Sequence, residues 1–229
     1  MHFSSSGLKA IAIVAMTLMH FACVFNGIIP FCLTCIFYTL GGIAFPIMAF
    51  CVSEGYAHTR SANKYLCRLL GLSFISAIPY WFVLGHEADS IFALAIGLAL
   101  LMLRDHLRDR PFLCWTIVAV ACVISMPIVN WGGIGPLIVV LFGVLKGKER
   151  ITQPIAVLTI GASLPNALRI ISEQAAALLP DLLFTSIGCG ASAYFIGRYD
   201  GTLGNMPKML FYIYYPAHIV ILGILGVII

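Results

Sequence analysis

Charged side chains are scarce in this chain. Asp, Glu, Lys and Arg make up 10% of its 229 residues, whereas hydrophobic residues make up 61% and the mean hydropathy is +1.03. Soluble globular domains usually contain about 25% charged residues, so this scarcity excludes that class. The sequence also lacks a polar stretch long enough for a separate soluble domain. We therefore expect residues 1–229 to form a single membrane-embedded domain.

The sequence shows no complete metal-binding motif and no nucleic-acid-binding module. Its eight cysteines are scattered, mostly within apolar runs, where a free thiol behaves as a small hydrophobic side chain. Cys32 and Cys35 form one C-x-x-C pair, but no second pair and no nearby histidine completes a tetrahedral zinc set. A disulfide between these two cysteines stays open. We expect no bound metal and no nucleic-acid partner.

The chain consists instead of successive apolar runs, which predict an all-α fold. A spanning helix needs about 20 predominantly apolar residues, so we expect a polytopic transmembrane helical bundle of about eight to ten spans, with nine favoured. Gly, Pro, Asn and charged residues stand between the runs and are typical of helix ends. The predicted helices cover residues 8–25, 31–53, 64–84, 90–104, 111–128, 133–146, 153–171, 179–198 and 207–228.

Basic residues fall in alternate connections of this tiling. Twelve of the thirteen Lys and Arg residues lie on the side of the N-terminus, and Arg169 is the exception. The opposite connections hold the acidic residues Glu87, Asp89, Glu173 and Asp181. Because cytoplasmic loops are enriched in Lys and Arg, we predict a multi-pass protein of the cytoplasmic membrane with its N-terminus inside and its C-terminus outside.

A histidine interrupts the first apolar run. His20 follows Lys9 by eleven residues, or about three helical turns, so both side chains lie on one helix face about 16 Å apart. With the lysine at the membrane surface, the imidazole would reach the middle of the bilayer. Ionisable groups at such depth are costly and usually face a bundle interior or a water-filled cavity. His20 is therefore a candidate catalytic residue; the alternative is a structural histidine bonded to a neighbouring helix.

A second histidine lies in the last apolar run, at nearly the same predicted depth. His218 follows Lys208 by ten residues, about 15 Å along a helix, which predicts a cavity shared with His20. Tyr215 lies close to it, and Pro216 would loosen the helical hydrogen-bond ladder and expose carbonyl groups. A structural histidine is the alternative here too.

A cluster of ionisable residues follows the second apolar run. Lysine and arginine side chains in such a cluster can bind phosphates through point charges and guanidinium forks. On composition alone, a loop that touches anionic lipid headgroups is the favoured alternative. The cluster consists of Glu54, His58, Arg60, Lys64 and Arg68.

The chain resembles the TraX family, membrane proteins associated with N-terminal acetylation of conjugative pilin. The resemblance rests on the order and spacing of four motifs: AMTLMH, LGGIAFPIMAFCVSEGYAHTRSANKYLCRLL, ISAIPY and YYPAHIVIL. More distantly, the spacing of Lys9 and His20 is similar to the Arg-x10-His signature of integral-membrane acyltransferases. The resemblance implies a bundle in a bacterial inner membrane that passes an acetyl group from cytoplasmic acetyl-CoA to an amine or hydroxyl. Peptides, glycans and small amines are all compatible acceptors.

The resemblance also implies roles for individual residues. His20 would be the reactive histidine, Lys9 would take the place of the signature arginine, and His218 matches the histidine of the terminal YPAH motif. Candidates for the CoA phosphates are His58, Arg60, Lys64 and Arg68. Candidates for contact with the acceptor are Glu54, Tyr215 and Asn130.

Three positions depart from the family pattern. Met19 stands where the family usually has an aspartate before the histidine, and Gly42 stands where it usually has an arginine. Asn130 precedes Trp-Gly where an aspartate commonly precedes Tyr-Gly. The first two changes remove a carboxylate that would orient the imidazole and a cation that would hold an anionic group.

These observations favour an acetyltransferase in which His20 acts as general base. Burial favours a neutral imidazole, which can accept a proton from the acceptor as it attacks the thioester carbonyl. Direct transfer is preferred over an acetyl-imidazole intermediate, and we expect His20 to line a polar tunnel joined to the cytoplasm. Two alternatives stay open: a transporter or channel, since buried histidines and Pro-broken helices also mark solute paths, and a catalytically silent binding or assembly protein.

Overall fold

Helices make up nearly all of the regular structure in the computed structural model, which describes residues 2–85 and 88–228. Glu87, named above for its charge, lies outside the described residues. The elements are α1 (Ser5–Val24), α2 (Phe31–Gly41), α3 (Ala44–His58), α4 (Ala62–Val83), α5 (Ser90–His106), α6 (Pro111–Ser125), α7 (Ile134–Val144), α8 (Glu149–Glu173), the 3-10 turn η1 (Ala176–Leu178), α9 (Leu179–Leu183), the π-helix η2 (Phe184–Gly188), α10 (Cys189–Ile196) and α11 (Lys208–Ile228).

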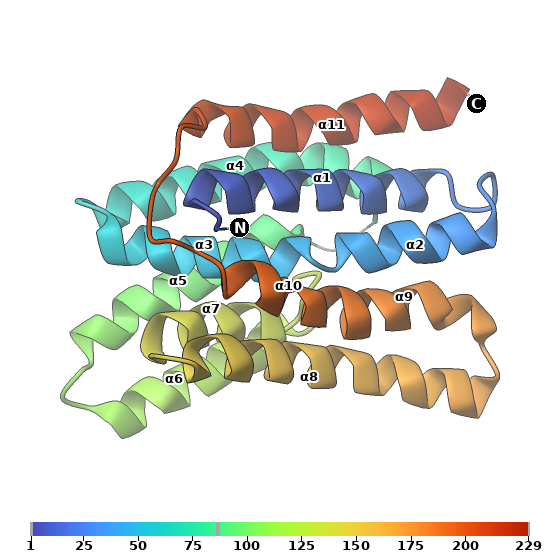
Figure 1. The fold of residues 1–229 in the computed structure, drawn as a ribbon. Helices are drawn as coiled ribbons and strands as arrows, with labels where there is room; N and C mark the ends of the chain where they lie inside the picture. Colours follow the sequence, from blue (N-terminus) through green and yellow to red (C-terminus); the bar gives the residue numbers. More distant parts are fainter. Residues whose placement is uncertain (1, 86–87, 229) are drawn as a thin grey trace.

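The predicted all-α bundle is confirmed, and each of the predicted ranges overlaps a helical stretch. Figure 1 shows the longer helices side by side along one direction. α6 and α7 are shorter apolar helices. Six stretches of the described residues are long and apolar enough to cross a membrane: Ser5–Val24, Phe31–His58, Ala62–Val83, Glu149–Glu173, Ala176–Ile196 and Met209–Ile228.

Two helices predicted as continuous are interrupted. The helix predicted over 31–53 breaks between α2 and α3 at Gly42, and the one predicted over 179–198 contains the π-helix η2. A side-chain carbon on Gly42 would collide with the backbone of Phe184 and Gly188, and one on Gly188 would collide with the Thr39 carbonyl. The two interruptions therefore touch each other, and only glycine permits this approach.

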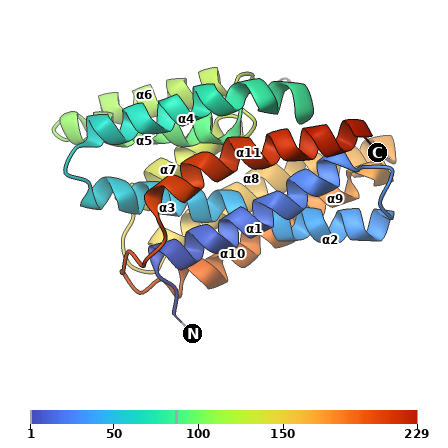
Figure 2. The ribbon, with the colours of Figure 1, turned by 90° about the horizontal axis from the view of Figure 1, so that it is seen from above.

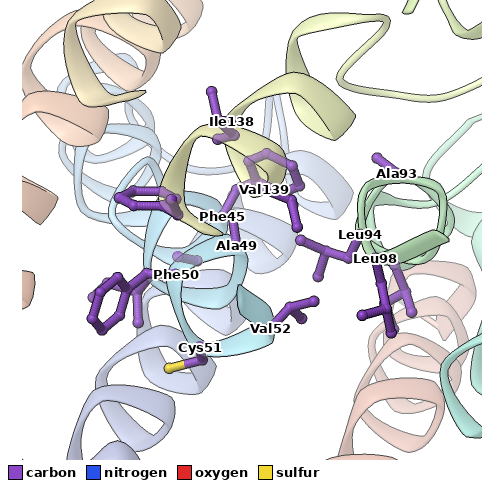
Figure 3. Close-up of a cluster of buried hydrophobic side chains, with 14 of the residues drawn as sticks. Phe45, Ala49, Phe50, Cys51, Val52, Ala93, Leu94, Leu98, Ile138 and Val139 are labelled. Carbon is purple, nitrogen blue, oxygen red and sulfur yellow. The ribbon is translucent and has the colours of Figure 1, made fainter. Parts of the chain in front are cut away.

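The apolar core lies between α3, α5 and α7. α3 is buried on all sides, as expected for a helix without a polar face. Figure 3 shows side chains of α3, among them Phe45 and Val52, gathered in one cluster with Leu98 of α5 and Val139 of α7. Gly97 lets α5 approach α7, because a side chain there would meet Val139. Close contact through small residues is typical of membrane helix packing.

The connections alternate between the two ends of the bundle. Those joining α3 to α4, α5 to α6, α7 to α8 and α10 to α11 lie at the end where α1 begins, and the C-terminus lies at the opposite end (Figure 1). Figure 2 shows α11 running between α4 and α1 in the same bundle. We call the first end the basic end, because the predicted clustering of Lys and Arg falls there. Which end faces the cytoplasm stays a prediction.

Candidate functional site

The two histidines singled out in the sequence contact each other. His20 of α1 and His218 of α11 have exposed fractions of 4% and 5%. His20 Nδ1 and His218 Nε2 are 2.8 Å apart, and the two rings are nearly parallel, at 6°, with centroids 5.1 Å apart. Both imidazoles face the bundle interior and not lipid. As the sequence predicts, α1 and α11 place their histidines at the same level.

The hydrogen bonds of this pair define where the protons lie. His218 Nδ1 is 3.0 Å from the carbonyl oxygen of Tyr214, which can only accept a hydrogen bond. With both rings neutral, His218 Nδ1 therefore carries the proton and its Nε2 accepts. His20 Nδ1 must then donate to that atom. This leaves the lone pair of His20 Nε2 as the free basic position of the pair.

Tyrosines surround the pair and fix its position. The rings of Tyr80 and Tyr215 both lie 6.5 Å from His20 in edge-on arrangements, and Tyr215 is buried. The Tyr214 ring lies against His218 with centroids 5.1 Å apart. Its hydroxyl is 2.7 Å from that of Thr17, which donates to the Ile13 carbonyl, so Tyr214 donates to Thr17. This chain of bonds ties α11 to α1 just beside the histidines.

The connection between α6 and α7 brings Asn130 next to this cluster. Its side-chain amide donates to the Tyr80 hydroxyl at 2.9 Å, while its backbone N–H donates to the Ala88 carbonyl at 3.0 Å. The neighbouring Asp89 is buried and caps α5, and it accepts a hydrogen bond from the Ser76 hydroxyl. Asn130, named from the sequence, is thus one step removed from His20 through Tyr80.

The pair lies closer to one end of α1 than the sequence suggested. His20 is fifteen residues after Ser5, about 22 Å along the helix, and four residues before Val24, about 6 Å. α1 is unbroken, so Lys9 and His20 stay about 16 Å apart and do not touch. The histidines thus belong to the half of α1 that lies opposite the basic end.

Of the two best-formed cavities among the described residues, neither is lined by His20 or His218, so neither is the shared cavity that the sequence predicts. The larger, about 430 Å³, is an apolar groove along the α1 face that carries Ile11, Val14 and Leu18, opposite the face of His20. The smaller, about 320 Å³, is bounded by Asn130 and by residues of α7, α8, α9 and η2. The expected tunnel from the basic end to His20 is neither of these cavities.

Glu54 is already paired. Its carboxylate forms an ion pair with the Arg150 guanidinium. The Arg150 Nε donates to the Phe142 carbonyl at 2.7 Å, and its Cζ lies 5.1 Å from the centroid of the Phe50 ring. His58 is exposed and bonds back to the Glu54 carbonyl at 2.9 Å. Glu54 therefore joins α3 to α8, an arrangement that favours a structural role over contact with an acceptor.

The remaining basic candidates are exposed at the basic end. Lys64 and Arg68 lie one turn apart on α4, on the same helix face as Ile75 and Phe82, which are 64% and 81% exposed. Such a stripe faces lipid, so this placement favours headgroup contact for these two residues. Arg60 is exposed just before α4. Across the described ranges, none of the three has a carboxylate within 4 Å.

Packing explains one departure from the family pattern, Gly42, and shows what surrounds another, Met19. The side chain of Met19 packs directly on Gly41, where α2 ends. Gly42 has no room for a side chain, because the η2 backbone occupies the space. An arginine at position 42 would therefore force the two interrupted helices apart.

Sequence reasoning missed four residues that the fold brings to the histidine end of the bundle. Tyr80 belongs to a quoted motif, but nothing in its context marked it as a neighbour of His20. Asp89 and Asp181 each stand beside an apolar run, but the sequence alone indicates only that they are loop charges. The four residues are Tyr80, Asp89, Asn166 and Asp181.

The two cysteines of the C-x-x-C pair, Cys32 and Cys35, are both free thiols, so the structure has no disulfide between them.

Comparison with known proteins agrees with the sequence resemblance. The family model for TraX protein matches residues 4–226. The chain is 30% identical, over an alignment 239 positions long, to the probable fimbrial assembly protein FimC, serogroup H1, of Dichelobacter nodosus; the alignment covers 96% of this chain and 94% of that protein. No solved structure matches the chain. The match over nearly the whole length shows that the chain belongs to the TraX family.

Proposed function

We propose that this chain is a membrane-embedded acetyltransferase that moves an acetyl group from cytoplasmic acetyl-CoA to an amine or hydroxyl of a peptide or cell-surface acceptor. The observation that supports this best is the buried His20–His218 pair, which leaves His20 Nε2 as a free base. Two ionisable groups inside an apolar bundle are costly to keep, and a purely structural bond would need only one of them to be a histidine.

In the proposed reaction, His20 Nε2 takes a proton from the acceptor amine as the amine nitrogen attacks the thioester carbonyl carbon. The new C–N bond forms, the C–S bond breaks, and CoA leaves as a thiolate. His20 then returns the proton to the thiolate sulfur. The step needs no covalent enzyme intermediate and no further reactant.

His218 would take the orienting role that an aspartate usually has. As His20 Nε2 gains a proton, its Nδ1 proton can pass to His218 Nε2 across the 2.8 Å bond. The resulting charge on His218 is stabilised by the Tyr214 carbonyl, 3.0 Å from Nδ1. The pair thus replaces the carboxylate that is lost at Met19.

The donor would approach from the basic end. We propose that the CoA phosphates bind among His58, Arg60, Lys64 and Arg68, of which Arg60 stands apart from the lipid-facing stripe of α4. The thioester must then reach the level of His20, which lies about 16 Å beyond Lys9 along α1. An opening between α1 and its neighbours is required for this, because neither cavity connects the two.

Purified protein offers the direct test. We expect acetyl-CoA to release free CoA and the acceptor to gain an acetyl group detectable by mass spectrometry. His20→Gln should lower the rate by about 10²–10⁴-fold, because glutamine keeps the hydrogen bonding but cannot take a proton. The exposed His106→Gln serves as the matched control and should leave the rate unchanged. Equal rates for His20→Gln and wild type would exclude the general-base role.

A catalytically silent assembly protein is the second candidate. It is favoured by the absence of two polar side chains usual in the family, at Met19 and at Gly42, where packing leaves no room for an arginine, and by the name of the Dichelobacter nodosus relative, a fimbrial assembly protein. Wild-type protein that neither binds nor consumes acetyl-CoA, while still folded, would support this second function.

A further inference from the structure

The smaller cavity has the chemistry of an ammonium site. We propose that the cavity beside Asp181 binds an organic ammonium group and so presents amine acceptors to the bundle; this inference rests on the proposed function. The cavity measures about 320 Å³ and its wall includes Asp181, Asn166, Asn130, Thr185, Trp131 and Phe184. These residues come from the connection before α7, from α8 and from the interrupted stretch α9–η2, and none of them lies at the basic end.

Asp181 differs from the other acidic residues that are removed from water. Glu54 is paired with Arg150, and Asp89 accepts from the Ser76 hydroxyl and the Phe92 N–H. The Asp181 carboxylate is half-buried, and among the residues that the structure describes no cation lies within 4 Å of it. The nearest opposite charge, on Arg169, is paired with Glu173 at 3.4 Å. A negative charge partly removed from water favours a bound cation.

Aromatic rings make the cavity suited to an organic cation. Trp131 stacks on Phe45 with centroids 4.3 Å apart, and Phe184 lies 5.5 Å from its ring. Tyr38 meets Phe184 edge-on at 6.4 Å, and the Asp181 carboxylate is near enough to interact electrostatically with Tyr38. An ammonium group gains from the faces of aromatic rings as well as from a carboxylate, whereas a hydrated metal ion does not.

The π-helix holds the wall of this cavity in place. The Thr185 hydroxyl donates to the Asp181 carbonyl at 2.9 Å and accepts from Ser163 of α8 at 3.1 Å. Single π-helical turns are rare and occur often at functional sites. Asn166 also lines the cavity, and its side chain makes no hydrogen bond within the described chain. It is therefore free to accept from an ammonium N–H.

Asn130 links the cavity to the histidine pair. It lines the cavity and donates to the Tyr80 hydroxyl, and the Tyr80 ring stands edge-on to His20 at 6.5 Å. An acceptor that docks its ammonium group at Asp181 would thus wait one residue layer from the base. On leaving the carboxylate it would give one proton to water, and the free amine would then lose the second proton to His20 as it attacks. The donor and the acceptor would then enter from opposite ends of the bundle.

Calorimetry on the purified full chain tests the site without any turnover. The probe is phenylalaninamide near neutral pH, where an α-amino group is largely charged, and N-acetylphenylalaninamide is the uncharged counterpart. We expect only the charged probe to bind. Asp181→Asn should weaken its binding by about 10- to 100-fold, the usual worth of a charge-assisted contact.

Glu149→Gln is the matched control, because Glu149 is acidic and exposed but lies at the basic end, outside the cavity; binding by this variant should equal wild type. Asn166→Ala should weaken binding severalfold and serves if Asp181→Asn fails to fold. Equal binding of the two probes, or unchanged binding in both cavity variants, would overturn the proposal. Probe binding at Asp181 without any acetyl transfer would leave the site standing and refute the proposed function. Acetyl transfer that is lost in His20→Gln but unchanged in Asp181→Asn and Asn166→Ala would support the proposed function and refute the ammonium site.

Discussion

The two ends of the bundle use their polar residues differently. At the basic end, most of the described ionisable side chains are exposed or already paired, as in Glu54 with Arg150. At the opposite end, a smaller number of polar groups is drawn into the bundle: the His20–His218 pair, Asp89 and the cavity at Asp181. Exposed charges cost little to maintain, whereas buried ones must be offset by packing elsewhere. The buried end is therefore the better candidate for chemistry, and the basic end for orientation and recognition.

The largest expected effect separates the partners within the histidine pair. His218→Gln keeps an acceptor for His20 Nδ1 but cannot take up a proton, so acetyl transfer should fall by about 10²-fold, near the low end of the worth of acid–base groups. Acetyl-CoA binding should stay as in wild type. A fall in thermal stability that matches the fall in rate would instead identify the pair as a structural contact.

The hydropathy and the charge pattern of the sequence were sufficient to predict the helical bundle and the alternation of its connections between the two ends. The 3.6-residue geometry also placed His20 and His218 at one level, because each could be counted from a lysine on the same helix. The crossing of the two interrupted helices could not be predicted. It depends on Gly42 meeting Gly188, residues far apart in the chain whose identity alone says nothing about contact. Asp181 was missed for the same reason, since its cavity exists only where η2 passes α7 and α8.

The second prediction concerns stability at the basic end. Glu54→Gln leaves the Arg150 guanidinium, which is partly buried, without its carboxylate. We expect the free energy of unfolding to fall by about 1–3 kcal/mol, which a lower thermal midpoint in detergent would report. Phenylalaninamide binding should not change. The exposed Glu149→Gln at the same end is the control; if Glu54→Gln is equally harmless, Glu54 is free to act as a ligand after all.

A smaller effect is expected from the exposed cations. Arg60→Gln together with Lys64→Gln should weaken acetyl-CoA binding by about 1 kcal/mol per contact, because exposed charges are screened, and added salt should weaken wild-type binding too. The pair Lys146→Gln and Lys148→Gln, in another connection of the same end, is the comparison. If both pairs have the same small effect, the basic end acts through its general charge, as expected for lipid headgroups, and not through a phosphate site.

The last prediction contrasts one aspartate from each end. Burial raises the pKa of Asp89, which lies just before α5, to about 6, whereas hydrogen bonds from the Thr202 hydroxyl and N–H lower the pKa of the exposed Asp200 at the basic end. A folded-state pKa above the unfolded value means that the folded protein binds more protons, so the Asp89 contribution is present below about pH 4 and is lost as the pH rises through about 6. Asp200 acts in the opposite sense, and its contribution is lost as the pH falls through its lowered pKa. The thermal midpoint of wild type should therefore fall as the pH rises from about 4 to about 6. Asp89→Asn should not show this fall, whereas Asp200→Asn should. A decline of the same slope in wild type and Asp89→Asn would show that Asp89 ionises in the folded protein as it does in water.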